Sequence, residues 1–200
     1  MSWPPDIAVL SRRRRREGAK AGARPLVSDS FNRANGAIGV ADTGQTWIDE
    51  GEGWQVLSNT ARATGSPGAL GAQACVLNAG VSDCTITVTF STYSSAQFIA
   101  FRLSDVNNLL AFYLSGTNTA RILKLAAGTQ TTAYTTTTNT NIASGDIYSV
   151  TLSGSSITLK QNGVQIGTTQ TNSFNQTATN HGIGTNTTAS RFDTFSVTVP

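Results

Sequence analysis

Hydrophobic and polar residues alternate one by one along much of this chain, and that period of two is typical of a half-buried β-strand. In residues 164–167, for example, Val164 and Ile166 would share an inward face. The segments with this pattern are 84–90, 147–152, 156–160, 164–167 and 195–199. We expect each of them to form a strand with one face on a core and a Thr- or Ser-rich face in solvent.

Two further segments, 97–103 and 108–114, are richer in apolar residues, as central strands are. The pair Asn162-Gly163 lies between two alternating segments and predicts a tight hairpin turn. The threonine-rich tract 129–141 has few apolar side chains, which favours an edge strand or an exposed loop. About a dozen short strands without a helical segment predict an all-β protein, folded as an antiparallel two-sheet jelly-roll sandwich.

Charge divides the chain into two unequal parts. Residues 1–25 carry seven basic and two acidic side chains, a net charge of +5, whereas residues 26–200 carry seven basic and nine acidic ones, a net charge of −2. We therefore expect a sandwich domain over 26–200 and a separate basic arm over 1–25. Because the basic surplus lies in the arm, it does not indicate that the sandwich binds nucleic acid.

The arm combines a run of five arginines with a short apolar patch, and nothing in it could bury a core alone. Three interpretations stay open: a solvated basic linker, a nucleic-acid contact, and an anchor whose arginines pair with carboxylates in a groove of a larger assembly. The anchor is the interpretation that the resemblance described below favours. Its residues would be Trp3, Arg12, Arg13, Arg14, Arg15, Arg16, Lys20 and Arg24.

The sequence predicts neither a membrane span nor a secretory signal. No apolar run approaches 18 residues. The apolar residues 7–10 come before the arginines, whereas a signal peptide has its positive charge first. We therefore expect synthesis in the host cytoplasm without a signal peptide.

The two cysteines, Cys75 and Cys84, bracket an eight-residue segment. If residues 79–80 formed the tip of a hairpin, the two side chains would face each other, and a disulfide between them is one interpretation. Two small buried thiols are the other. Two thiols and a single histidine, His181, do not make a convincing zinc site.

Three segments together resemble the concanavalin A-like (laminin G/glucanase-type) β-sandwiches. ITLKQNGVQIGTT (157–169) is similar to their late hairpin, and HGIGTNTTASRFDTFSV (181–197) to their closing segment. The opening stretch 29–65, with Asp-x-Phe-x-Arg, Gly-x-x-Trp and Trp-x-Val, resembles such modules in phage minor tail and other virion proteins. The resemblance covers residues 26–200.

The resemblance implies a sandwich whose first and last strands pair, so that residues 29–31 lie next to 191–195. It also implies that Trp47 and Trp54 pack in the core beneath the first loop. Glucanases of this superfamily carry Glu-x-Asp-x-(x)-Glu on one strand, and that run does not occur here. Because glycoside hydrolysis usually needs two carboxylates at a set spacing, we predict a non-enzymatic protein.

Asp49, Glu50 and Glu52 form the one acidic cluster of the sequence, in a glycine-flanked loop. We interpret it as a solvated turn, while a calcium site and a catalytic pair stay open as alternatives. His181 lacks a marked serine partner and is expected to be structural. No nucleotide-binding glycine loop is present in the sequence, so no cofactor is predicted.

Alternation also suggests a binding surface. If Ile99, Phe101 and Leu103 face the core, then Phe98 and Arg102 face outward, and Tyr113 joins them from the neighbouring segment. Phe98, Arg102 and Tyr113 are thus the candidate carbohydrate-binding residues. The alternative is that a second layer or a neighbouring subunit covers this face, and a one-residue shift would reverse the assignment.

Together with these observations, the resemblance to virion modules implies a non-enzymatic phage virion protein, either a minor tail or a capsid decoration protein. The arm would bind other virion proteins, and many copies would display the sandwich at the virion surface for weak adhesion to host-envelope glycans. A polysaccharide-degrading enzyme of the same fold and a basic-armed protein that contacts nucleic acid are the two alternatives.

Overall fold

A computed structural model describes residues 25–51, 53–66, 68–116, 118–136 and 141–199 of the chain. Within these residues the larger sheet has ten strands. Their order is β14 (Val164–Gln165), β13 (Ser156–Gln161), β12 (Asp146–Ser153), β7 (Thr85–Thr92), β17 (Arg191–Thr198), β5 (Thr60–Ala63), β4 (Trp54–Leu57) and β2 (Gly36–Ala37). In addition, β1 (Val27–Asp29) pairs with β17, and β15 (Gln170–Thr171) pairs with β13.

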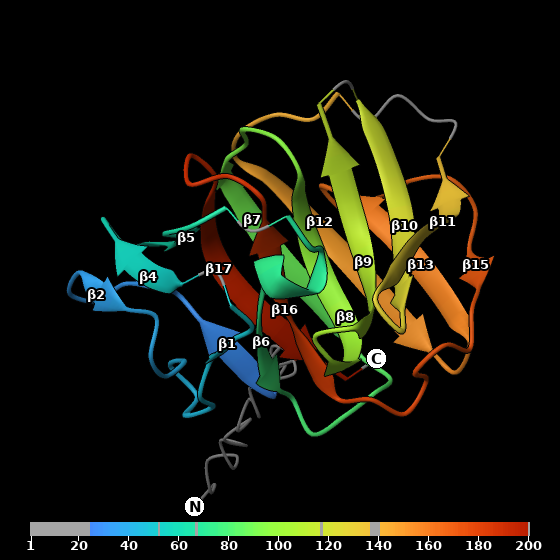
Figure 1. The fold of residues 1–200 in the computed structure, drawn as a ribbon, viewed down its shortest axis with the longest axis horizontal. Coiled ribbons are helices and arrows are strands. Elements are labelled where there is room, and N and C mark those ends of the chain that lie inside the picture. The colour runs from blue at the N-terminus through green and yellow to red at the C-terminus, as the bar shows by residue number, and fades with distance from the viewer. Residues whose placement is uncertain (1–24, 52, 67, 117, 137–140, 200) are drawn as a thin grey trace, which may run out of the picture.

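The smaller sheet has seven strands within the same described residues. Their order is β11 (Thr129–Thr135), β10 (Thr119–Ala126), β9 (Asn108–Ser115), β8 (Gln97–Asp105), β16 (Asn180–Thr185), β6 (Ala74–Asn78) and β3 (Ile48–Asp49). A short 3-10 helix, η1 (Gly71–Gln73), precedes β6 and lies in front of this sheet in Figure 1. No helix in the described part of the chain is long and apolar enough to cross a membrane.

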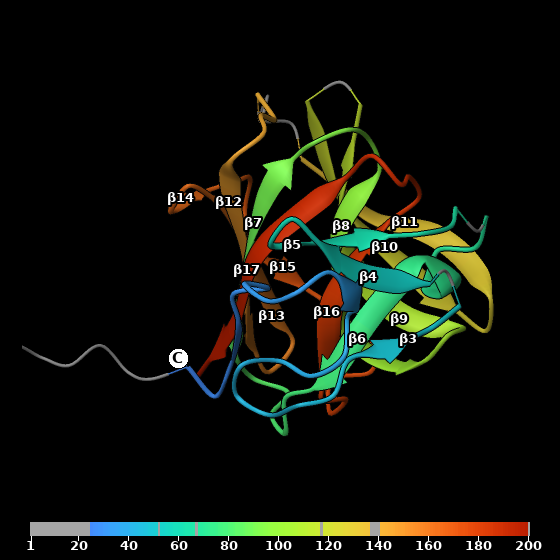
Figure 2. The same cartoon turned by 90° about the vertical axis from the view of Figure 1, so that its left-hand side faces the viewer.

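The two sheets pack face to face, which Figure 2 shows with β7 and β12 in one layer and β9 and β10 in the other. Aromatic rings join the layers: Phe112 of the smaller sheet meets Tyr148 of the larger one at 5.8 Å, and Tyr148 meets Phe90 at 4.9 Å. Such edge-to-face and tilted ring pairs stabilise a core beyond the area that they bury. The predicted all-β two-sheet antiparallel sandwich is therefore confirmed.

Most inward faces predicted from alternation are also confirmed. Ile86, Val88 and Phe90 of β7 are fully buried, as are the inward residues of β12 and β13. The 164–167 segment is an exception, because Val164 is 71% exposed and only Ile166 turns into the core. The reason is that β14 ends at Gln165 and does not continue as a regular strand.

Two predicted connections are present in the structure. Asn162 and Gly163 have φ angles of 50° and 81°, the left-handed backbone that a two-residue hairpin turn requires. The first and last strands pair, with Val27 opposite Val197 and Asp29 opposite Phe195. The threonine tract supplies β11, an edge strand of the smaller sheet.

Of the two interpretations of the cysteines, the structure excludes the disulfide, because the segment between them does not form a hairpin. Cys75 lies on β6 of the smaller sheet, whereas Cys84 immediately precedes β7 of the larger one. The segment between them therefore crosses from one sheet to the other instead of turning back on itself. Both thiols are free and fully buried, as the second interpretation of the sequence expected.

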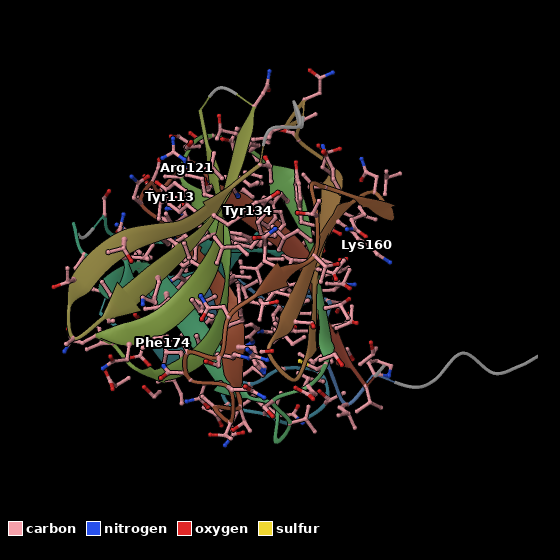
Figure 3. All side chains as sticks on the ribbon, turned by 90° about the vertical axis from the view of Figure 1, so that its right-hand side faces the viewer. Tyr113, Arg121, Tyr134, Lys160 and Phe174 are labelled. Carbon is pink, nitrogen blue, oxygen red and sulfur yellow. The ribbon has the colours of Figure 1, made fainter. Side chains whose placement is uncertain are left out.

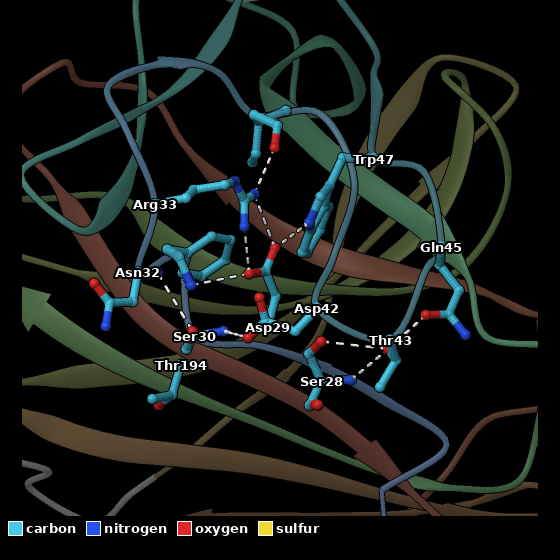
Figure 4. A network of polar contacts seen from close by, with 12 residues as sticks. Ser28, Asp29, Ser30, Asn32, Arg33, Asp42, Thr43, Gln45, Trp47 and Thr194 are labelled. Carbon is cyan, nitrogen blue, oxygen red and sulfur yellow. Dashed lines mark hydrogen bonds and ion pairs between the residues drawn. The ribbon is translucent and has the colours of Figure 1, made fainter.

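A buried network joins the Asp-x-Phe-x-Arg motif of the opening segment to Trp47 (Figure 4). The Asp29 carboxylate is 1% exposed and accepts hydrogen bonds from the Arg33 guanidinium, the Phe31 backbone N–H and the Trp47 indole. Arg33 also donates to the Ile38 carbonyl at 2.5 Å. Trp47 and Trp54 are both 5% exposed, so the prediction that they pack in the core is confirmed.

The proposed anchor residues, Trp3 through Arg24, lie outside the described residues.

Candidate functional site

The candidate site lies on the outer face of the smaller sheet, the face turned away from the larger sheet. Strand register places Gly184 of β16 opposite Phe98 of β8, Phe98 opposite Tyr113 of β9, and Tyr113 opposite Arg121 of β10. Paired residues of neighbouring strands point to the same face. These four residues therefore form one row across four strands, which we call the Tyr113 row.

Phe98 and Tyr113 form a stack in this row. Their ring centroids are 6.0 Å apart and the ring planes are 26° from parallel. Phe98 is fully buried, whereas Tyr113 is half-buried and keeps part of its ring in solvent. The lower ring thus supports the upper one, and Tyr113 presents a fixed aromatic surface.

The Phe98 ring fits against β16 because residue 184 is a glycine and has no side chain. A Cβ atom built on Gly184 would lie 2.0 Å from the Cζ atom of Phe98, far inside van der Waals contact. The ring therefore lies directly over the backbone of β16. Any side chain at Gly184 would push Phe98 away and disturb the ring of Tyr113 above it.

Arg121 is the polar neighbour of Tyr113 (Figure 3). Burial raises the pKa of the Tyr113 hydroxyl, and the positive charge of Arg121 opposes that shift. The hydroxyl therefore stays protonated at neutral pH and can donate a hydrogen bond. The row offers an apolar ring, a hydroxyl and a guanidinium on one surface.

The described positions of the Tyr113 row and of the row beside it include no carboxylate. In the next row, register aligns Val76, Gly182, Ala100, Ala111 and Leu123. Ala100, Ala111 and Phe98 pack with Leu70 and six other buried residues into a second apolar cluster on the outer face.

The prediction that Arg102 shares this surface is wrong. The register of β8 shifts between Phe101 and Asp105, and Arg102 has a left-handed φ of 52°. Such a bulge inverts the facing of the residues that follow it. Leu103 consequently joins the outer cluster, although alternation predicted it in the main core. The Arg102 side chain is fully buried, donates to the carbonyls of Asn172 and Gly154, and lies 3.8 Å from Asp83.

His181 has the structural role expected of it. Its Nδ1 atom accepts a hydrogen bond from the Arg102 backbone N–H, and its Nε2 atom lies 3.0 Å from the Val81 carbonyl oxygen. Burial lowers the pKa of His181 to about 4, and burial likewise raises the pKa of the Cys84 thiol, 3.6 Å away, to about 12. A neutral imidazole beside a protonated thiol is not an activated nucleophile pair.

In the acidic loop, the carboxylates of Asp49 and Glu50 lie near that of Asp105, a residue that the sequence did not suggest for this site. Burial, then the charges of Asp105 and Asp49, raise the pKa of Glu50. Glu52 lies outside the described residues, and within them no three metal-binding side chains are grouped closely enough to hold an ion. The calcium alternative for Asp49, Glu50 and Glu52 therefore stays untested, because Glu52 is not among the described residues.

Sequence reasoning correctly placed Phe98 and Tyr113 on one surface but did not include their neighbour Arg121. A signal was present, since Arg121, Leu123 and Leu125 alternate directly after the turn at residues 116–118. Reading that segment as a strand adjacent to 108–114 would have placed Arg121 beside Tyr113.

Comparison with known proteins identifies the fold and nothing finer. The sequence matches no protein family model, and no curated protein sequence matches it either. The structure is similar to the carbohydrate-binding module CBM66 from Bacillus subtilis, with a TM-score of 0.55 and 12% identity over 76% of this chain and 92% of that one.

Two glycoside hydrolases are also similar in structure. The GH43 protein BlXynB from Bacillus licheniformis gives a TM-score of 0.60 and 13% identity, covering 86% of this chain but only 39% of that longer one. SCLam, a non-specific endo-β-1,3(4)-glucanase from family GH16, gives a TM-score of 0.51 and 10% identity, covering 88% of this chain and 91% of that one. The chain has the concanavalin A-like sandwich fold. At these identities the likeness concerns the fold alone.

Proposed function

We propose that this protein is a non-enzymatic glycan-binding sandwich that attaches to carbohydrate through the Tyr113 row. The observation that carries the proposal is the partly buried Tyr113 side chain, stacked on buried Phe98 and flanked by Arg121. A sugar ring has an apolar C–H face that packs on an aromatic ring, while its hydroxyls accept hydrogen bonds from a tyrosine or arginine. The similarity in fold to a carbohydrate-binding module supports the same class of ligand.

The proposal gives the row no catalytic role. Hydrolysis of a glycosidic bond usually requires two carboxyl groups about 5–10 Å apart on either side of the bond. The Tyr113 row and the row beside it hold none. A single tyrosine platform binds weakly, so useful adhesion requires many copies on one particle.

The setting that we propose is a phage virion, on whose surface the arm of residues 1–25 anchors the sandwich. Support comes from the resemblance of the 29–65 segment to virion modules and from the charge of +5 in the arm against −2 in residues 26–200. Deletion of residues 1–25 should leave a folded sandwich, because β1 begins at Val27. The truncated protein should no longer join particles, and its assembly at the normal level would refute the anchor.

A glycan array with the full chain tests the glycan-binding role. We expect Tyr113→Ala to abolish binding and Arg121→Ala to weaken it at least tenfold. Val164→Ala, at an exposed position of the larger sheet, serves as the control and should bind normally. Phe98 is a poorer probe, because it is fully buried and its loss would disturb the fold. Unchanged binding by Tyr113→Ala would remove this row from the proposal.

An enzyme is the second candidate, and one observation favours it. The raised pKa of Glu50, near Asp49 and Asp105, is a property of a general acid. Release of reducing ends from a polysaccharide, lost in Glu50→Gln and kept in Tyr113→Ala, would support hydrolysis and overturn the non-enzymatic proposal.

A further inference from the structure

A shallow groove with a volume of about 390 Å³ lies near the opposite end of the smaller sheet from Tyr113. Register places Asn78 of β6 and Leu103 of β8 on either side of Asn180 of β16, and these three line its floor. Asn175 and residues 177–179, which precede β16, form its rim. Most lining side chains carry a hydroxyl or an amide: Asn78, Ser104, Asn175, Thr177, Thr179 and Asn180.

The groove has a fixed shape, because its rim is bonded to the sheet. Asn175 has a left-handed φ of 49°, and its Nδ2 atom lies within 3.1–3.2 Å of the Arg102 carbonyl, the Ser104 hydroxyl and the Asn108 carbonyl. The Thr179 hydroxyl donates to the Asn78 side chain at 2.9 Å. A binding site built on such fixed loops loses little entropy when a ligand enters.

Two side chains in the groove have hydrogen-bonding capacity to spare. Within the described residues, neither the Asn180 amide nor the Thr177 hydroxyl bonds to another residue of the chain. The amide supplies two donors and an acceptor, and the hydroxyl supplies one donor and two lone pairs. Leu103 adds an apolar patch between these polar groups.

The charges around the groove select against an anion. No lining side chain is charged, so nothing there would pair with a carboxylate, sulfate or phosphate. The Ser104 hydroxyl already donates to the neighbouring Asp105 carboxylate at 3.2 Å, and that negative charge would repel an anionic ligand. Uncharged compounds with several hydroxyl groups fit this combination of amides, hydroxyls and one leucine.

We propose that this groove is a second binding site, for a short neutral oligosaccharide, and that it works independently of the Tyr113 row. Asn180 and Gly184 are four residues apart on β16, which corresponds to about 13 Å along a strand. The apolar cluster on the outer face, which includes Leu70 next to η1, extends from Phe98 in the Tyr113 row to Leu103 in the groove. Two sites on one chain would raise the avidity of a multivalent particle without any new contact.

Nuclear magnetic resonance on the 15N-labelled full chain tests the groove directly. The probes are neutral trisaccharides, namely laminaritriose, maltotriose and xylotriose, each titrated to about 10 mM to allow for weak binding. The anionic comparison is trigalacturonic acid. We expect at least one neutral sugar to shift the backbone amide signals of residues 177–180, and trigalacturonic acid to leave them in place.

The variants separate this proposal from the function proposed above. Asn180→Ala and the more exposed Thr177→Ala should each weaken binding at the groove at least fivefold. Asn32→Ala, an exposed asparagine in the first loop, is the matched control and should change nothing. Tyr113→Ala should also leave the shifts at residues 177–180 unchanged.

The groove proposal would be overturned by no shift with any neutral sugar or by a larger shift with trigalacturonic acid. It would also be overturned if Asn180→Ala and Thr177→Ala bound the neutral sugar as tightly as the unmodified protein. Shifts confined to the strands around Tyr113 would also overturn it, while leaving the proposed function intact. Conversely, shifts at the groove together with glycan binding that is insensitive to Tyr113→Ala would support the groove and refute the Tyr113 row.

Discussion

The guanidinium of Arg33 forms a two-point ion pair with the buried carboxylate of Asp29, from Nη1 to Oδ1 at 2.7 Å and from Nη2 to Oδ2 at 3.1 Å. The Trp47 indole donates to the same carboxylate at 2.8 Å, and the Phe31 N–H donates at 2.9 Å. The first loop is thereby joined to β1, which pairs with the last strand of the domain. These contacts hold the two ends of the sandwich together.

Loss of the arginine should therefore destabilise the whole domain. We expect Arg33→Ala to lower the free energy of unfolding by about 3 kcal/mol, because a buried carboxylate loses its cation. Arg33→Lys should restore only part of this loss, since an ammonium group cannot reproduce the planar two-point contact. Urea unfolding followed by tryptophan fluorescence measures both. The control is Arg62→Ala on β5, because Arg62 takes part in neither ion pair of the described residues. Equal stability of the two variants would contradict the assignment.

The contact between Gly184 and Phe98 leads to a prediction that links fold and site. A methyl group at Gly184 would overlap the Phe98 ring, so Gly184→Ala should cost about 2 kcal/mol through overpacking. Tyr113 would lose its support, and glycan binding through the Tyr113 row should fall with it. Gly116→Ala is the control, because a Cβ atom there has no neighbour within 4 Å. Thermal unfolding and the glycan array measure the two effects.

Alternation in the sequence located core faces where a strand is regular, as in β7, β12 and β13. It failed at Arg102, because a bulge inverts the facing and no residue type marks the left-handed φ of that arginine. Two of the three candidate glycan residues, Phe98 and Tyr113, precede or lie outside the bulge and do share a surface. The groove was not predictable, since its parts come from three strands and a loop distant in sequence.

The cysteines illustrate a second limit of local patterns. Asn78 to Gly80 carries an ordinary turn signal, which is equally consistent with a hairpin and with a crossing between sheets. Only the pairing of β6 with β16, and of β7 with β12 and β17, distinguishes the two. Long-range pairing of this kind leaves no mark on the few residues of the turn.

The two thiols should be unreactive in the folded protein. Burial raises the pKa of Cys84 to about 12, and burial also raises that of Cys75 well above its usual value. Because the thiolate is the reactive form, Ellman's reagent should modify neither cysteine at pH 8 until the protein unfolds, and should then modify both. A reducing agent should leave the unfolding midpoint unchanged. Rapid modification of the native protein would contradict the burial of either thiol.

His181 provides the last prediction, which concerns pH. Burial is the main cause of its lowered pKa of about 4, against 6.5 when the residue is exposed. Its Nδ1 atom accepts from the Arg102 N–H, so protonation there would break a buried hydrogen bond. Between pH 6.5 and pH 4 the unfolded chain binds a proton at this residue that the native protein does not. The free energy of unfolding therefore falls as the pH falls through this range.

Because this is the single histidine of the chain, a substitution isolates its effect. We expect the free energy of unfolding of the unmodified protein to fall by about 2 kcal/mol between pH 7 and pH 5, since one pKa unit corresponds to about 1.4 kcal/mol. His181→Gln should be less stable at pH 7 but should lose little more on acidification, because glutamine binds no proton. Urea titrations at five pH values measure both slopes. Parallel pH profiles for the two proteins would show that His181 is protonated without unfolding and would refute the buried, neutral imidazole.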